Sequence, residues 1–305
     1  MRNSEIIYLE RHMSNSNINK KQLEKLRSYS SIFSSTSFNR LLRYNDYSFI
    51  NHNIKTYDLS KVGSRFENYH EYIRFVYTEL RKQYRNEYIY KNTLINDVLI
   101  KKYGVKDTIA INEFRVGDSI ADIVMFNGTS KAFEIKTELD TNKRLKGQLT
   151  NYTKIFKENF IVTHESLTDK YLKVDDTVGI IQIVEFPRSL KIEEIRPAKT
   201  NNEIDSDSLI RSLRTEEYKN IVKKHYGSLP KMTSFDMFNI CSELFKQIPQ
   251  ESLNFLFIEQ MKKRKSNMNE LSSFHKELRQ IGLALNLNSD SFNKLNKQLT
   301  VPIKI

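Results

Sequence analysis

The segment from Asp122 to Lys136, DIVMFNGTSKAFEIK, constrains the fold of this 305-residue chain more than any other. Its centre, Asn127-Gly128, is a strong signal for a β-hairpin turn, and apolar runs typical of strands flank it. The turn would fold Asp122 back beside Glu134 and Lys136. Because alternate residues of a strand point to the same face, Glu134 and Lys136 would share one face of the second strand. The sequence therefore predicts two carboxylates and a lysine gathered on adjacent strands.

Two carboxylates beside a lysine suit metal-assisted hydrolysis of a phosphodiester bond. Mg²⁺ prefers oxygen ligands and keeps several waters, so Asp122, Glu134 and the backbone carbonyl of Ile135 would make a sufficient metal site, with Mn²⁺ as a substitute. A bound metal ion activates a coordinated water and neutralises charge that develops on the attacked phosphate. Lys136 would orient or deprotonate that water. We therefore expect Asp122, Glu134 and Lys136 to be catalytic, with Mg²⁺ as the cofactor.

Glu113 and Arg115 lie on a predicted strand just before Asp122. Glu113 is the first candidate for an auxiliary acid that binds a second metal ion or orients Lys136. Glu87, near the end of the preceding helix, competes for this role, and Glu113 is favoured because it lies closer to Asp122 in the sequence. Arg115 shares the strand face of Glu113 and would bind a phosphate of the substrate.

A helix is predicted after Lys136, because Arg144, Gln148 and Tyr152 recur at intervals of four residues. Together with the hairpin, this pattern resembles the PD-(D/E)XK nuclease superfamily, and Gln148-Leu-Thr-Asn-Tyr152 resembles the Q-x-x-x-Y helix of its RecB-like branch. The resemblance covers residues 88–186 and implies that these three side chains bind substrate or support Lys136. Two departures stand out: Ala121 replaces the proline of the signature, and the variable upstream acid has no unique match.

The resemblance also implies the fold class. It predicts an α/β protein whose restriction-endonuclease-like core has a mixed central sheet flanked by helices, with helical N-terminal and C-terminal extensions. The domains would be residues 1–66, a polar and partly helical extension; residues 67–198, the nuclease-like domain; and residues 199–305, a helical domain. Apolar spacing predicts a helix over residues 68–84, a strand over 178–186, an edge strand over 190–195 and a helix over 207–226.

The composition favours a nucleic-acid partner and a cytoplasmic location. The 49 Lys and Arg exceed the 37 Asp and Glu, a net charge of +12, and phosphate contacts from such side chains supply most non-specific affinity for DNA. Basic clusters occur at residues 81–85, 143–146 and 262–265. The single cysteine, Cys241, excludes an intrachain disulfide. No apolar run is long enough for a membrane span, so we expect no membrane partner.

These observations lead to one functional prediction and several alternatives. The prediction is a Mg²⁺-dependent deoxyribonuclease, an endonuclease and hydrolase that binds and cuts foreign or phage DNA in bacterial antiviral defence. The alternative from another class is a catalytically silent nuclease fold that binds nucleic acid or protein and acts as a regulator. DNA repair and an RNA-cleaving effector are further alternatives.

Two points stay open in the sequence. The helices of residues 199–305 would present DNA, recruit a protein partner, form a homodimer or only complete the fold. An isolated Glu-x-Lys triplet is also common by chance in a chain with 28% charged residues, and Gln148 and Tyr152 are alternatively ordinary packing residues.

Overall fold

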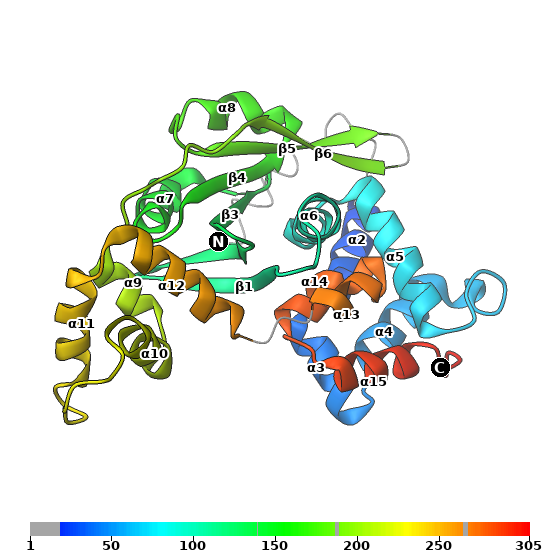
Figure 1. Cartoon of the computed structure of the whole chain (residues 1–305). Coiled ribbons are helices and arrows are strands. Elements are labelled where there is room, and N and C mark those ends of the chain that lie inside the picture. The colour runs from blue at the N-terminus through cyan, green and yellow to red at the C-terminus, as the bar shows by residue number, and fades with distance from the viewer. Residues whose placement is uncertain (1–18, 139, 187–188, 265–267) are drawn as a thin grey trace.

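A mixed β-sheet forms the centre of the molecule (Figure 1). The computed structural model describes residues 19–138, 140–186, 189–264 and 268–305. Within these ranges, six strands pair in the order β1-β2-β3-β4-β5-β6. In chain order they span Ile109–Val116, Ser119–Phe126, Ser130–Lys136, Glu158–His164, Gly179–Phe186 and Ser189–Arg196. The β1/β2, β2/β3 and β5/β6 pairs are antiparallel, whereas β3/β4 and β4/β5 are parallel.

Helices before and after the sheet make up most of the remaining chain. The N-terminal ones are α2 (Lys20–Ile32), α3 (Ser35–Tyr44), α4 (Ser48–Asn53), η2 (Ile54–Asp58), η3 (Leu59–Lys61), α5 (Tyr69–Gln83), α6 (Glu87–Leu94) and η4 (Ile95–Lys102). Between strands lie η5 (Asn142–Arg144), α7 (Leu145–Thr153), η6 (Glu165–Leu167) and α8 (Thr168–Leu172). The last are α9 (Ser206–Ser212), α10 (Thr215–Tyr226), α11 (Met237–Gln247), α12 (Gln250–Lys262), α13 (Met268–Ser273), η7 (Lys276–Leu278), α14 (Arg279–Ala284) and α15 (Ser289–Leu299).

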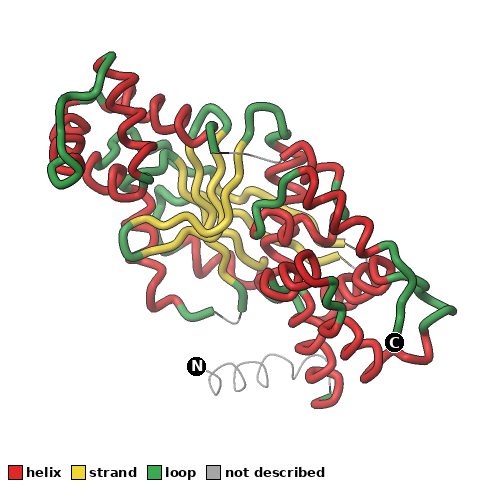
Figure 2. The backbone as a smooth tube through the Cα atoms, turned by 90° about the horizontal axis from the view of Figure 1, so that it is seen from below, coloured by secondary structure: helices red, strands yellow, loops and turns green. Residues whose placement is uncertain are grey.

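Consecutive residues of the central strands face opposite sides of the sheet. In β2, Ile123 and Met125 join one apolar core, whereas Val124 and Phe126 join the other. The β4 run from Phe160 to Val162 is apolar without interruption, as expected for a strand buried on both faces. Seen from below, the strands lie between two groups of helices (Figure 2). The sheet is therefore covered on both sides.

The two groups of helices come from different parts of the chain. One core combines residues of α2 to α6 and η4 with residues of α13 to α15. The other combines α7 with α9 to α12. Residues 199–305 therefore divide between the two sides of the sheet, with α13 to α15 beside the N-terminal helices (Figure 1). The predicted domain boundaries at residues 66/67 and 198/199 stay predictions.

The predicted N-terminal extension contributes more core than its polar composition suggests. Residues 1–18 lie outside the described residues, but α2 and α3 bury Tyr29, Ile32, Phe38 and Leu41. Their apolar side chains recur at helical spacing, and α2 packs against α5 whereas α3 packs against α15, which places both in the same core as the sheet.

Several predicted elements are confirmed, with shifted ends. The helix over residues 68–84 is α5, which Asn68 caps by accepting a hydrogen bond from the backbone N–H of Glu71. The strands over 178–186 and 190–195 are β5 and β6. The helix over 207–226 is wrong as one element, because Leu213 and Arg214 adopt extended backbone between α9 and α10.

The coarse fold prediction is confirmed: the protein is a mixed α/β structure with helices flanking a mixed sheet. Among the described helices, none has the length and hydropathy needed to cross a bilayer.

Candidate functional site at the β2–β3 junction

The predicted hairpin is confirmed and brings Asp122 beside β3. The turn contains Gly128 at φ +95°, a conformation that glycine adopts without strain. The β2/β3 ladder ends at Ile123 and Phe133. Beyond it, Asp122 Oδ2 accepts a 2.8 Å hydrogen bond from the backbone N–H of Ile135. The Asp122 side chain thus satisfies a backbone donor where the two strands separate.

Glu134 lies at the centre of the predicted residues. Lys136 Nζ donates to Glu134 Oε1 at 2.8 Å, and Gln148 Nε2 donates to the same oxygen at 2.6 Å. The Tyr152 hydroxyl lies 2.8 Å from Glu134 Oε2 and 2.7 Å from the carbonyl oxygen of Ile120. The structure therefore brings Glu134, Lys136, Gln148 and Tyr152 together.

Helix α7 positions two of these side chains. Gln148 and Tyr152 are one turn apart, and the buried Leu145 and Leu149 hold the helix against the sheet. The Glu134 side chain is only 3% exposed and that of Lys136 10%. The cluster is therefore largely removed from water.

Lys91, which completes the site from α6, was not predicted from the sequence. Its side chain is 6% exposed, and its Nζ lies 2.9 Å from Asp122 Oδ1 and 2.6 Å from Glu87 Oε1. Glu87 and Lys91 are four residues apart, a spacing that in sequence indicates an ordinary ion pair on a helix surface. The only available signal was the apolar context of Lys91, between Tyr90 and Leu94.

Burial and mutual repulsion act on the two central acids. Burial raises the pKa of Asp122 above its usual value, although Lys91 opposes the shift. Burial, and then the charge of Asp122, raise the pKa of Glu134, although Lys136 opposes it. Burial lowers the pKa of Lys91, but Asp122 and Glu87 outweigh burial and the net pKa is raised. Lys91 is therefore a firmly charged cation between acids.

The carboxylates of Asp122 and Glu134 are already engaged by protein donors. Each oxygen of Asp122 and Glu134 already faces a protein donor: Lys91, the Ile135 N–H, Lys136 with Gln148, and the Tyr152 hydroxyl. A metal ion at this site would compete with these donors for the same carboxylate oxygens. The predictions of Mg²⁺ or Mn²⁺, and of the Ile135 carbonyl as a ligand, stay predictions.

The remaining predicted residues lie outside this network. Glu113 occupies the β1 position opposite Asp122, between the paired Asn112 and Phe114, but it is exposed and has a φ of +56°. The acid that acts electrostatically on Asp122 is instead Glu87, the second candidate. Arg115 and Arg144 are exposed.

Two of the predicted basic clusters, at residues 143–146 and 262–265, differ in how exposed and unpaired their cations are. Lys143, Arg144 and Lys146 are exposed at the start of α7 and just before it. In the other cluster, Arg264 donates two 2.7 Å hydrogen bonds to Glu217, and Lys265 lies outside the described residues. Only the first cluster presents a cationic surface close to the helix of Gln148 and Tyr152.

A cavity of about 930 Å³ lies away from these residues. It is lined by the end of α7, the start of β4, the segment just before β5, the start of α12 and residues 199–201 and 203–205, with Lys154 and Asn159 among its polar side chains. Because it contains none of the predicted site residues, it is a separate feature of the fold.

Comparison with known proteins identifies the family. The family described as Bacteriophage P4 protein cII matches residues 80–285, which is more than half of the chain. This chain belongs to that family. The match contains Lys91, Asp122, Glu134 and the α7 residues, so the whole ion-paired site lies within the part shared with the family.

Individual relatives are distant. Protein cII of Enterobacteria phage P4 is 28% identical over 130 residues, which are 42% of this chain and 49% of that protein. The chain thus spans about half the length of this curated relative. A solved structure, the SPO1766 protein of unknown function from Silicibacter pomeroyi, covers 48% of this chain and 94% of its own, at 10% identity and a TM-score of 0.29. That similarity is too weak to carry an argument.

Membership in the cII family corrects the functional prediction. Both the family and the curated relative are named as a phage protein, cII, and neither name describes a nuclease. The predicted DNA-cutting enzyme of bacterial defence, with its description as nuclease, endonuclease, hydrolase and antiviral protein, is therefore wrong. At the site, the element that the sequence prediction lacked is Lys91, whose ammonium group pairs with Asp122, one of the two acids predicted to bind metal.

Proposed function

We propose that this cII-family protein is a regulator that binds nucleic acid without cutting it. On this proposal the core is a catalytically silent form of the restriction-endonuclease-like fold. The chain order β2, β3, α7, β4 and the gathering of Glu134, Lys136, Gln148 and Tyr152 support that kinship. Cytoplasmic location, and a protein partner or homodimer through residues 199–305, stay predictions.

The pairing of Asp122 with Lys91 carries the proposal. A carboxylate that binds Mg²⁺ must offer an oxygen to the ion, and here an internal ammonium group holds that oxygen at 2.9 Å. Buried ion pairs are costly to break, because removing one partner leaves an uncompensated charge. Lys91 therefore favours a closed, metal-free arrangement in which the acids hold α6, β2 and β3 together.

The exposed basic residues supply the binding surface on this proposal. Lys143, Arg144 and Lys146 lie at the N-terminal end of α7, where the helix dipole also favours anions. Arg115 adds an exposed cation on β1. With a net charge of +12, the whole molecule attracts a polyanion, and this local cluster would fix where the backbone lies.

The test is the salt dependence of DNA affinity, measured by fluorescence anisotropy with labelled duplex and single-stranded DNA. The triple variant Lys143→Gln, Arg144→Gln and Lys146→Gln should weaken binding and reduce the slope of log affinity against log salt by about 2–3 for duplex DNA, since each phosphate contact contributes roughly 0.9.

A matched control removes the same charge elsewhere. Lys294, Lys297 and Lys304 are exposed at the C-terminal end of the chain, and their replacement by Gln lowers the net charge equally. This control should retain most of the wild-type slope. Equal losses in both triples would mean that only overall charge matters, and the assignment of the surface around α7 would fail.

A further inference from the structure

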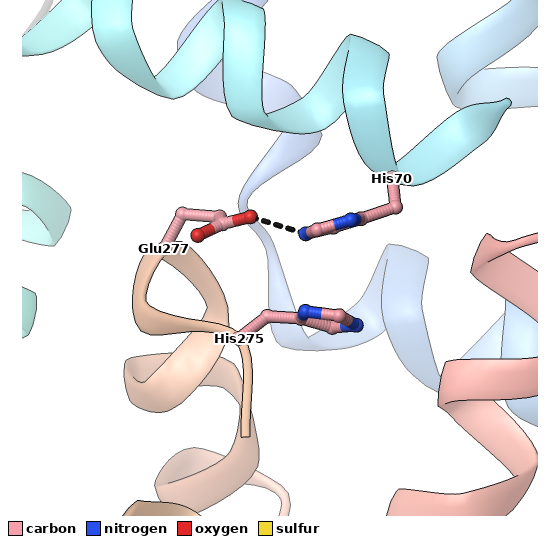
Figure 3. Close-up of side chains that lie close together, drawn as sticks. All are labelled: His70, His275 and Glu277. Atoms are coloured by element: carbon pink, nitrogen blue, oxygen red, sulfur yellow. Dashed lines mark hydrogen bonds and ion pairs between the residues drawn. The ribbon is translucent and has the colours of Figure 1, made fainter. Parts of the chain in front are cut away.

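A cluster of two histidines and one glutamate lies far from the β2–β3 junction in sequence and brings α5 together with the segment around η7. His70 lies in the first turn of α5, whereas His275 immediately precedes η7 and Glu277 lies within it. One nitrogen or oxygen atom from each side chain lies within 4.8 Å of the others. Figure 3 shows the two rings stacked, with Glu277 turned toward His70.

Imidazole nitrogens and a carboxylate oxygen are ligands that Zn²⁺ takes in proteins, commonly as two histidines and one acid with a water in the fourth position. Mg²⁺, which prefers oxygen, is a poor match for this set. We propose that His70, His275 and Glu277 form a Zn²⁺ site that joins α5 to η7.

The hydrogen bond that His275 makes through Nε2 leaves its Nδ1 atom available to bind a metal ion. Its Nε2 lies 2.7 Å from Asn296 Oδ1, an acceptor, so Nε2 carries the proton and Nδ1 keeps a free lone pair. Metal-bound histidines usually donate their other ring N–H to such an oxygen, which fixes both tautomer and orientation. Asn296 of α15 thus supplies an outer contact expected of a zinc site.

The backbone around the acid is also held in place. The Tyr88 hydroxyl donates to the carbonyl oxygen of Glu277 at 2.6 Å, and Asn92 Nδ2 donates to that of Lys276 at 2.8 Å. Glu277 itself is 7% exposed. A ligand on a segment fixed by its neighbours loses little conformational freedom when it binds a metal ion.

Small movements convert the cluster into a metal site. His70 Nε2 and Glu277 Oε1 lie 2.5 Å apart, whereas two ligands of a tetrahedral Zn²⁺ ion lie ~3.3 Å apart at the usual bond lengths. The two atoms would separate by less than about 1 Å. The stacked rings, with centroids 3.7 Å apart, would rotate so that both lone pairs face the ion.

The experiment measures Zn²⁺ binding to the full chain by titration calorimetry after treatment with EDTA, and the visible absorption of bound Co²⁺ as a probe of tetrahedral coordination. Wild type should bind one Zn²⁺ per chain at this site. Glu277→Gln, which keeps the shape and hydrogen-bonding ability of the side chain, should weaken this binding by more than the roughly 10–100-fold that loss of an outer-shell contact costs.

Three further variants keep the test decisive. His275→Phe retains a ring beside His70 and removes both nitrogens, so it should also lose Zn²⁺ binding. It provides a second test in case Glu277→Gln does not fold. His225→Ala, which removes an exposed histidine of α10, should bind as wild type does. Glu134→Gln should do the same. No saturable binding to wild type, unchanged binding in Glu277→Gln and His275→Phe, or loss only in Glu134→Gln would overturn the proposal.

Discussion

Two buried clusters of acids, lysines and tyrosines behave in opposite ways. Asp58 sits among the N-terminal helices, where its side chain is fully buried and faces Lys61 at 2.7 Å, Lys25 at 3.2 Å and the hydroxyls of Tyr29 and Tyr72. Burial alone would raise the pKa of Asp58, but these partners outweigh it and the pKa is lowered. The charged form of Asp58 is therefore stable where it lies.

At the β2–β3 junction the same residue types give the reverse result. Burial raises the pKa of Asp122 and of Glu134. The charge of Glu87 raises the pKa of Asp122 further, and the charge of Asp122 raises the pKa of Glu134 further. The negative charge of one acid is fully compensated by two lysines. Where several acids share two lysines, repulsion between the acids remains. The comparison separates a cluster that favours the charged form of its acid from one that favours the neutral form of its acids.

The largest expected effect is the loss of Asp58. Asp58→Ala removes the acceptor of two hydroxyls and two ammonium groups at a buried position, and we expect it to lower the free energy of unfolding by roughly 2–4 kcal/mol. Urea unfolding measures this. The control Asp118→Ala, at an exposed acid, should stay within about 0.5 kcal/mol of wild type. A similar small effect for Asp58→Ala would contradict its stabilising role.

The next effect concerns Lys91. Lys91→Met keeps an apolar stem of similar length and leaves Asp122 without its cation, so it should cost about 1–3 kcal/mol at neutral pH. The double variant with Asp122→Asn should recover part of this loss, because the uncompensated acid is gone. Additive losses in the double-mutant cycle would show that the two side chains do not interact.

Removing one hydroxyl from the site should have a smaller effect. Tyr152→Phe deletes the contacts to Glu134 and to the Ile120 carbonyl and should cost about 1 kcal/mol. Because the Tyr152 ring is buried in the core, the fold should remain intact. DNA affinity should not change, since the proposed surface is the exposed cluster around α7, and a large loss of affinity would place Tyr152 in that surface instead.

The smallest expected difference between the two clusters is the direction in which their contribution to the free energy of unfolding changes with pH. The lowered pKa of Asp58 gives stability that is present above the unfolded value of 3.8 and is lost as pH falls through the folded pKa. The raised pKa of Glu134 gives the opposite: its contribution is fully present below the unfolded value of 4.5 and is lost as pH rises through the folded pKa.

Unfolding measured against pH for wild type, Asp58→Asn and Glu134→Gln tests this. The stability advantage of wild type over Asp58→Asn should shrink below about pH 3.8. Its advantage over Glu134→Gln should instead shrink as pH rises above about 4.5. The same sign for both variants would break the comparison.

The sequence predicted the local features of the site better than its long-range ones. The Asn127-Gly128 turn and the four-residue spacing of Gln148 and Tyr152 are local patterns, and they place these residues beside Glu134 as expected. Lys91 was missed because its partner Asp122 lies on a different element, and only tertiary packing brings the two together.

The return of the C-terminal chain was missed for a similar reason. The apolar faces of α13 to α15 resemble those of α9 to α12 in sequence, and nothing local shows that they pack on opposite sides of the sheet. Function was the least predictable feature, because the same acids and lysine serve either as metal ligands or as an internal ion-pair network.

One incubation tests the central claim, that this protein binds nucleic acid and leaves it intact. End-labelled duplex and single-stranded DNA would be mixed with wild type or Lys136→Ala in Mg²⁺ at low salt, and each sample divided between a native gel and a denaturing gel. The account predicts a shifted complex on the native gel and full-length strands on the denaturing gel for both proteins. Shortened strands in wild type that disappear with EDTA or with Lys136→Ala, or no complex at all, would contradict it.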